Sequence, residues 1–107
     1  MQDKYRVTLT DRAMSDIKSI IVYYIALGLF NTAERVRKSI MESVNSLSYF
    51  PYRIALVSEK ALAEKGLRKM VSGKFLVYFY IYEEEKEVMI VAVIPAKCDQ
   101  QSKLFHK

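Results

Sequence analysis

The sequence predicts an α+β domain in the order β-α-α-β-β-β, with an N-terminal strand and an αα-hairpin packed on a mostly antiparallel sheet. The stretch from Leu67 to Ile94 contains three strand-like runs in succession, separated by Ser-Gly and by an acidic turn. The stretch before it contains two helical periodicities whose apolar faces need a sheet to cover them. With 107 residues, the chain is expected to form one domain with a single core, residues 1–107.

The first strand and the first helix follow from local pattern. Tyr5–Thr10 alternates apolar and polar residues, which is typical of a half-buried strand. Thr10 then precedes an acidic first turn and is a plausible N-cap. Gly28 is a natural stop for a helix that runs to about Leu27. Its apolar residues recur at three- and four-residue steps: Ala13, Ile17, Ile20, Ile21 and Tyr24.

The second helix has one clean apolar stripe. Asn31 and Glu34 have the spacing of a capping box, so the helix is predicted to begin there. It should end near Ser48, because Phe50-Pro51 cannot continue it. Two helices joined by a short loop form an αα-hairpin that packs on the following sheet. The stripe consists of Ala33, Val36, Ile40, Val44 and Leu47.

Residues 51–66 are the least regular part of the chain, with a short apolar segment at Ile54–Ser58 and a possible helical turn at Glu59–Lys65. The basic excess of the protein gathers in and just after this part, against only Glu59 and Glu64. It comprises Arg53, Lys60, Lys65, Arg68, Lys69 and Lys74.

The three predicted strands that follow are Leu67–Ser72, Lys74–Tyr82 and Glu87–Ile94, all rich in β-branched and aromatic residues. In the second of them Tyr78, Tyr80 and Tyr82 share one face. One face of the sheet is expected to be core. The other face is expected to be open, where the tyrosines can stack on bases or receive a partner segment. A functional site is expected on this open face, near Arg68.

Composition excludes several classes of protein. Lysine and arginine outnumber aspartate and glutamate by 17 to 12, a net charge of +5, which permits binding to phosphate backbones or acidic proteins without requiring it. A single cysteine and a single histidine cannot form an intramolecular disulfide or a usual zinc site, so no metal or cofactor is expected. The N-terminus does not resemble a signal peptide, and the eleven apolar-rich residues of Ile20–Phe30 are too few to cross a bilayer. We therefore expect a cytoplasmic protein.

The order and spacing of several pieces, taken together, resemble the RelE/ParE superfamily of bacterial toxin–antitoxin toxins, also described as plasmid stabilisation toxins. RelE-like members cleave mRNA on the ribosome, whereas ParE-like members share the fold but poison DNA gyrase. The matching pieces are Tyr5–Ala13 with Asp16-Ile17, then Tyr24, the stripe from Ala33 through Leu47 to Pro51, Gly66–Lys69, Phe75–Phe79, and Val91–Asp99 before Leu104.

The resemblance implies candidate residues for cleavage, in which a ribose 2′-OH attacks the adjacent phosphate without a metal. Such a reaction needs a proton acceptor, a proton donor and cations on the developing charge. Arg68 matches the strand arginine of the family, with an exposed arginine paired to a carboxylate as the alternative interpretation. Lys97 keeps one charge where many relatives have Arg-Arg-Asp, although Cys98 replaces the second basic residue and the bidentate grip of arginine is lost. His106 lies where some relatives place the acid, or is simply a tail residue.

The remaining cations of this region are candidates for binding RNA: Arg53, Lys60, Lys65, Lys69 and Lys74. For Lys60 and Lys65, a solvated loop lysine is the alternative interpretation. Glu59 and Glu64 are possible general bases, or surface helix charges.

The leading hypothesis is the toxin of a type II toxin–antitoxin module that acts as a ribosome-dependent mRNA endoribonuclease. Its expected partners are the ribosome, mRNA and a cognate antitoxin that folds on binding. The alternatives are a ParE-like inhibitor of DNA gyrase without hydrolytic activity, which the incomplete catalytic set favours, and a catalytically decayed binding member.

Overall fold

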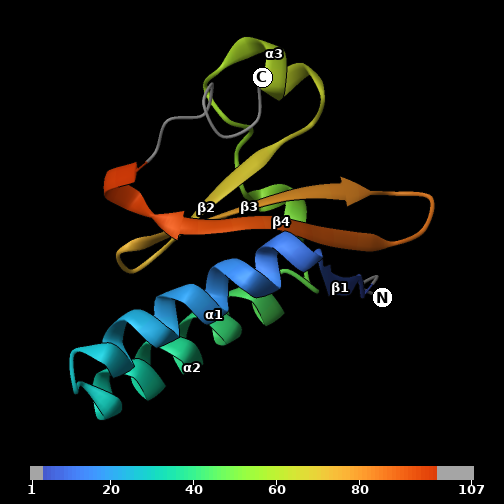
Figure 1. Cartoon of the computed structure of the whole chain (residues 1–107). Coiled ribbons are helices and arrows are strands. Elements are labelled where there is room, and N and C mark those ends of the chain that lie inside the picture. Colours follow the sequence, from blue (N-terminus) through green and yellow to red (C-terminus); the bar gives the residue numbers. More distant parts are fainter. Residues whose placement is uncertain (1–3, 99–107) are drawn as a thin grey trace.

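Four strands form one mixed sheet in the computed structural model, which describes residues 4–98 (Figure 1). The strand order is β1-β4-β3-β2. β3 (Phe75–Tyr82) pairs antiparallel with β2 (Arg68–Ser72) and with β4 (Glu87–Pro95). β1 (Arg6–Leu9) pairs parallel with β4. The predicted α+β class and its β-α-α-β-β-β order, with a mostly antiparallel sheet, are confirmed.

The first helix, α1 (Asp11–Ala26), begins and ends as the sequence predicts. The Thr10 hydroxyl accepts a hydrogen bond from the Ala13 N–H at 3.1 Å, which satisfies one of the unpaired donors of the first turn. Just past the helix, Gly28 has a φ of 76°, a left-handed conformation that glycine adopts without steric cost.

The predicted capping box of the second helix is wrong. α2 (Phe30–Ser46) begins before Asn31, with Leu29 at the N-cap position and no side-chain capping bond. The link between the helices is so short that the Leu29 carbonyl already accepts the Ala33 N–H, at 2.9 Å. Asn31 therefore lies inside the first turn. Glu34, which would have closed the box, forms an ion pair with Arg37 instead.

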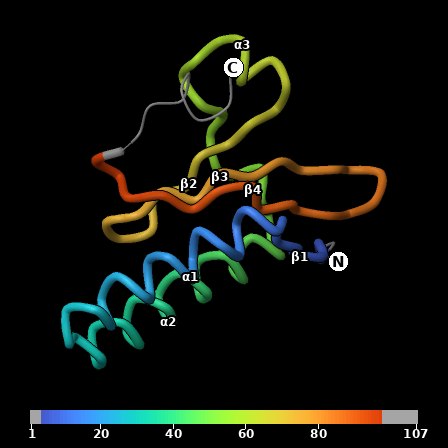
Figure 2. The backbone as a smooth tube through the Cα atoms, viewed as in Figure 1, coloured from blue at the N-terminus to red at the C-terminus, as the bar shows by residue number. Residues whose placement is uncertain are grey.

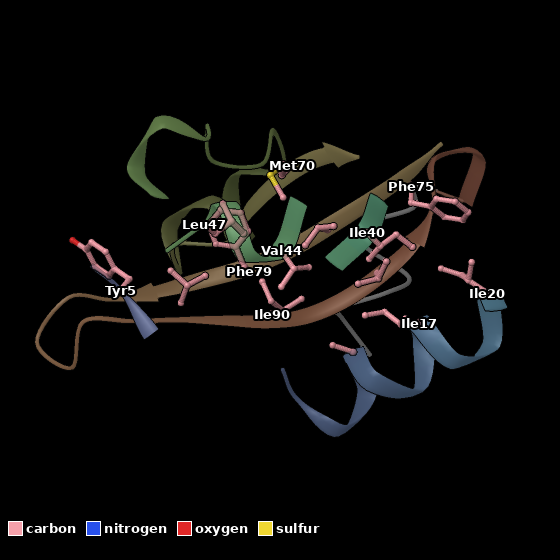
Figure 3. Packing of buried hydrophobic residues seen from close by; sticks show 14 residues of the cluster. Tyr5, Ile17, Ile20, Ile40, Val44, Leu47, Met70, Phe75, Phe79 and Ile90 are labelled. Atoms are coloured by element: carbon pink, nitrogen blue, oxygen red, sulfur yellow. The ribbon is translucent and has the colours of Figure 1, made fainter. Parts of the chain in front are cut away.

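The main core lies between this helical hairpin and one face of the sheet (Figure 3). Each helix packs on the sheet mainly through the half that is further from the hairpin tip. The tip of the hairpin therefore extends beyond the strands (Figure 2). The buried residues of α1 and α2 against the sheet include Ala13, Ile17, Ile20, Ile40 and Val44, followed by Leu47 at the end of α2, packed against Val77, Phe79, Val88 and Ile90.

A second, smaller core covers part of the opposite face, which we predicted to be open, so that prediction is wrong for this part of the sheet. After the 3-10 turn Pro51–Arg53, the chain forms the short helix α3 (Lys60–Glu64). Tyr78 is consequently 0% exposed, whereas Tyr82 at the far end of the same strand is 42% exposed. The predicted row of tyrosines is thus not one open surface. This second core consists of Val57, Leu62 and Leu67 packed on Leu76, Tyr78, Ala92 and Ile94.

A β-bulge in β4 makes both cores possible. Tyr78 pairs with Ala92 but the next residue, Phe79, pairs with Ile90, so Val91 is an extra residue. Without it, Ile90 and Ala92 would point to the same face. With it, Ile90 faces the helices and Ala92 faces α3.

No helix within residues 4–98 is long and apolar enough to cross a membrane.

We predict that the second core is needed for stability. Leu62→Ala should lower the free energy of unfolding by about 2–4 kcal/mol, because it leaves a cavity beneath α3. Leu56→Ala is the matched control, since that side chain is 45% exposed, and it should cost less than about 1 kcal/mol. Urea unfolding followed by circular dichroism measures both. Equal losses for the two variants would contradict the assignment of a second core.

Candidate functional site

Arg68 lies on the face of the sheet that carries the helices, not on the face where we expected a site. It is the Cα partner of Phe79, whose side chain is in the main core, and cross-strand partners share a face. Its guanidinium donates a hydrogen bond to the Ile54 carbonyl and lies 5.1 Å from the centre of the Tyr52 ring. Arg68 therefore ties the start of β2 to the loop before it.

Beside Arg68, three side chains converge on Glu83. The Tyr5 and Tyr52 hydroxyls donate to one carboxylate oxygen at 2.7 and 2.9 Å, and the Lys86 ammonium forms an ion pair with the other. Lys86 first, and then the two hydroxyls, lower the pKa of the Glu83 carboxyl to about 2. The hydrogen bond to this carboxylate and burial raise the pKa of Tyr5. Burial first, and then the same carboxylate, raise the pKa of Tyr52.

Arg53 also contacts its own chain. Its guanidinium donates to the backbone carbonyls of Tyr49 and Phe50 at 2.7 and 3.1 Å and to the Ser46 hydroxyl at 3.1 Å. Phe50 has a φ of 49°, which is unfavourable for a bulky residue, and Arg53 helps to hold this turn at the end of α2. Arg53 thus has a structural role in this geometry, and its predicted role in RNA binding stays a prediction.

The other predicted cations are dispersed. Lys60 begins α3 and Lys65 is its C-cap, and both are exposed. Lys69 pairs with Tyr78 and so lies on the opposite face from Arg68. Glu59, a possible general base, is the N-cap of α3 and accepts from the Ala61 N–H at 2.8 Å.

Arg68 lies beside the middle of β3, whereas Lys97 lies beyond one end of the sheet. Arg68 is opposite Phe79 and Pro95 is opposite Phe75, so these rows are four residues apart along β3. That spacing is roughly 13 Å in a strand, and Lys97 follows Pro95 in the turn Ala96–Cys98. His106, the third predicted catalytic residue, lies outside the described residues. The two catalytic cations that the structure describes are not brought together.

Lys97 instead lines a groove of about 770 Å³ between α1 and the ends of β3 and β4. The Lys74 carbonyl accepts from the Ala96 N–H at 2.8 Å, which holds the segments that carry Lys74 and Lys97 side by side. Asp16 of α1 accepts from the Val93 N–H at 3.0 Å and so joins helix to strand along the groove. The lining is mainly apolar: Ile20, Tyr23, Tyr24, Phe75, Val93, Ile94 and Pro95, with Ser19 and Ala96.

Within the described residues no cluster of three or more metal-ligating side chains is present.

A family model described as the ParE toxin of the type II toxin–antitoxin system parDE matches residues 7–99. The chain belongs to the ParE toxin family. The predicted membership of the RelE/ParE superfamily is thereby confirmed, and the chain is a toxin-family protein of type II toxin–antitoxin modules. No curated protein is a significant match to the sequence.

Solved structures of toxin–antitoxin systems share the fold of this ParE-family chain. The chromosomal ParDE system from P. aeruginosa aligns with a TM-score of 0.71 and 20% identity, over 87% of this chain and 97% of that one. The RelBE2 toxin–antitoxin complex from Mycobacterium tuberculosis gives 0.65 and 20%, over 87% and 93%. The archaeal RelE–RelB complex from Pyrococcus horikoshii OT3 gives 0.59 and 13%, over 89% and 98%. At these identities the similarity establishes the fold alone.

Sequence reasoning missed the two features that the fold assembles from distant segments. Glu83 belongs to the acidic turn before β4, and Tyr5 precedes β1, so nothing in their spacing signals contact. The groove likewise joins α1 to residues that lie far beyond it in the sequence, such as Lys74 and Lys97. The parallel pairing of β1 with β4 brings Tyr5 beside the turn of Glu83 and carries α1 toward the end of β4.

We predict that Glu83 makes stability depend on pH in the acid range. Its pKa falls from 4.5 in the unfolded chain to about 2 in the folded protein. The stabilisation is therefore fully present above the unfolded pKa and is lost as the pH falls toward the folded value. Across that window the wild-type chain should lose more free energy of unfolding than Glu83→Gln. Urea unfolding at a series of pH values tests this, and parallel curves for the two proteins would contradict it.

Proposed function

We propose that this ParE-family toxin inhibits DNA gyrase by binding it, and that it does not cleave mRNA. The main support is the placement of Arg68 and Lys97, which lie in different parts of the fold. These are the two described residues that were expected to stabilise a phosphate during cleavage. Catalysis of this kind depends on preorganised charges that converge where negative charge develops. This separation supports binding over cleavage, because the two cations are not held side by side around one point.

The contacts of Arg68 support the same proposal. Its guanidinium is half-buried, donates to the Ile54 carbonyl and lies over the Tyr52 ring. Moving the guanidinium away from this position would cost the Ile54 carbonyl a charge-assisted hydrogen bond, so Arg68 is held where it serves the fold. The match to the ParE family model adds to this, since ParE-like toxins poison gyrase.

The ribonuclease hypothesis is the second candidate. It is favoured by the exposed lysines Lys60, Lys65 and Lys74, which offer a basic surface for an RNA backbone. In this alternative the ribosome would reposition Arg68, since catalytic contacts often form only in the complex with substrate. His106 remains its predicted acid.

The prediction is that the purified chain inhibits gyrase supercoiling, while its brief induction in bacteria leaves translated mRNA uncut. Arg68→Ala should keep gyrase inhibition within about threefold of wild type, because the change removes structural contacts of roughly 1–2 kcal/mol without touching an interface. Supercoiling of relaxed plasmid and primer extension on a reporter mRNA are the two measurements.

Lys38→Ala, at an exposed position on α2, is the control for nonspecific effects of removing a positive charge. Cuts at codon positions that disappear in Arg68→Ala but persist in Lys38→Ala would overturn the gyrase proposal and establish the ribonuclease. Circular dichroism of each variant verifies that it is folded.

A further inference from the structure

The tip of the helical hairpin, Ser19–Thr32, contains no Asp, Glu, Lys, Arg or His. It comprises the second half of α1, the link between the helices and the start of α2. Charged residues make up 27% of the chain, so a stretch of this length without any sets the tip apart from the rest of the surface. The tip extends beyond the strands, and the sheet therefore does not cover it (Figure 1).

Large apolar side chains are exposed all around this tip. Phe30 is 64% exposed, and five others are between 43% and 60% exposed. Successive residues of a helix point about 100° apart, so the side chains of α1 among them leave the helix in different directions. A helix end that is apolar all round needs cover on every side, which a lipid layer provides and a single protein surface does not. The six side chains are Val22, Tyr23, Ile25, Leu27, Leu29 and Phe30.

Two exposed cations, Lys18 and Arg35, form a basic collar where the tip joins the rest of the hairpin. Lys18 directly precedes the uncharged stretch on α1, and Arg35 follows it on α2. At 1.5 Å per residue, they lie roughly 8–13 Å along the helices from the interhelical link. Amphipathic helices on membranes bury their apolar residues about 5–10 Å deep and keep their cations with anionic headgroups. The spacing of tip and collar therefore fits an anionic lipid surface.

The carboxylates closest to the collar do not oppose this attraction, because both have partners within the protein. Glu34 forms an ion pair with Arg37. Asp16 accepts a hydrogen bond from the Val93 N–H at 3.0 Å and lies 3.6 Å from the Arg12 guanidinium. The collar therefore presents positive charge toward any surface that the tip touches.

The polar groups of the tip limit how far it can enter a membrane. The first turn of α2 has no side-chain cap, so its N–H groups need water or headgroup oxygens as acceptors. The hydroxyl of Tyr23 likewise favours the headgroup layer, where tyrosine is enriched. Within residues 4–98 no helix is long and apolar enough to cross a bilayer. Contact at the membrane surface, without a spanning segment, is the arrangement that these features allow.

We propose that the hairpin tip docks this protein on an anionic lipid bilayer. Leu27, Leu29 and Phe30 enter the boundary between headgroups and acyl chains, while Lys18 and Arg35 contact the lipid phosphates. The net charge of +5 adds attraction at longer range. This inference goes beyond the proposed inhibition of gyrase and does not depend on it.

The test measures co-sedimentation of the full chain with vesicles of equal parts phosphatidylglycerol and phosphatidylcholine. The tip variant, Leu29→Gln with Phe30→Gln, should bind about tenfold more weakly or worse, because two large apolar side chains no longer enter the boundary layer. The collar variant, Lys18→Gln with Arg35→Gln, should also lose about tenfold or more on these vesicles. On vesicles of phosphatidylcholine alone, it should differ from wild type by less than about twofold, because that surface has no net charge.

Matched controls lie outside the hairpin. Leu56→Gln with Tyr82→Gln removes two exposed apolar side chains from the loop before β2 and from the end of β3. Lys60→Gln with Lys65→Gln lowers the net charge by as much as the collar variant does, but at α3. Both should bind vesicles within about threefold of wild type, because neither changes the tip or the collar. Circular dichroism verifies that every variant is folded.

Loss of vesicle binding in the tip and collar variants, with binding retained in both controls, supports the inference. Equal binding by the tip variant and its control overturns it, as does a wild-type chain that does not sediment with anionic vesicles. Sedimentation velocity without lipid examines the alternative of a second copy of this chain. A dimer that the tip variant dissociates, together with no vesicle binding, would make the tip a protein interface and the inference would fail. Gyrase inhibition is measured without lipid, so either result leaves that proposal as it stands.

Discussion

The burial of β3 on both faces is the constraint on which the rest of the structure depends. Phe75 to Phe79 are all buried, with alternate side chains directed to the helical hairpin and to the α3 layer. A central strand of this kind needs cover on each side, and the chain supplies it from a long hairpin and from a short, irregular segment. Arg53 within the irregular segment and Arg68 at the start of β2 hold that segment in place, so these two cations serve the fold.

The bulge at Val91 lets β4 satisfy these two layers and also shapes the groove. Before the bulge β4 pairs with β1, and after it the edge of β4 has no strand partner within the described residues. There Asp16 accepts the Val93 N–H in place of a strand partner, and Pro95 further along has no N–H to pair. The Asp16 carboxylate and Pro95 thus leave this edge of β4 with fewer free donors for pairing with another strand.

Periodicity predicted the fold almost completely, because the elements differ in local pattern. Thr10 and Gly28 set the ends of α1 by backbone chemistry that is readable in sequence. The capping box at Asn31 was wrong because the length of the interhelical link, a tertiary constraint, set the start of α2. The face of Arg68 could not be predicted from its strand alone, since both faces of the sheet carry apolar residues and register decides between them. The contacts of Glu83 depend on segments far apart in the chain.

These contacts bear on how a toxin of this family can act. Catalysis needs several charges held at one point, whereas here the cations either bond to the protein's own backbone or are spread over α3, β2 and the groove. Binding needs exposed side chains with shape and some charge, and Tyr23, Leu27, Lys74 and Lys97 provide these along one helix. The backbone contacts of Arg53 and Arg68, together with these exposed side chains, are the reasons for proposing that this protein acts by binding.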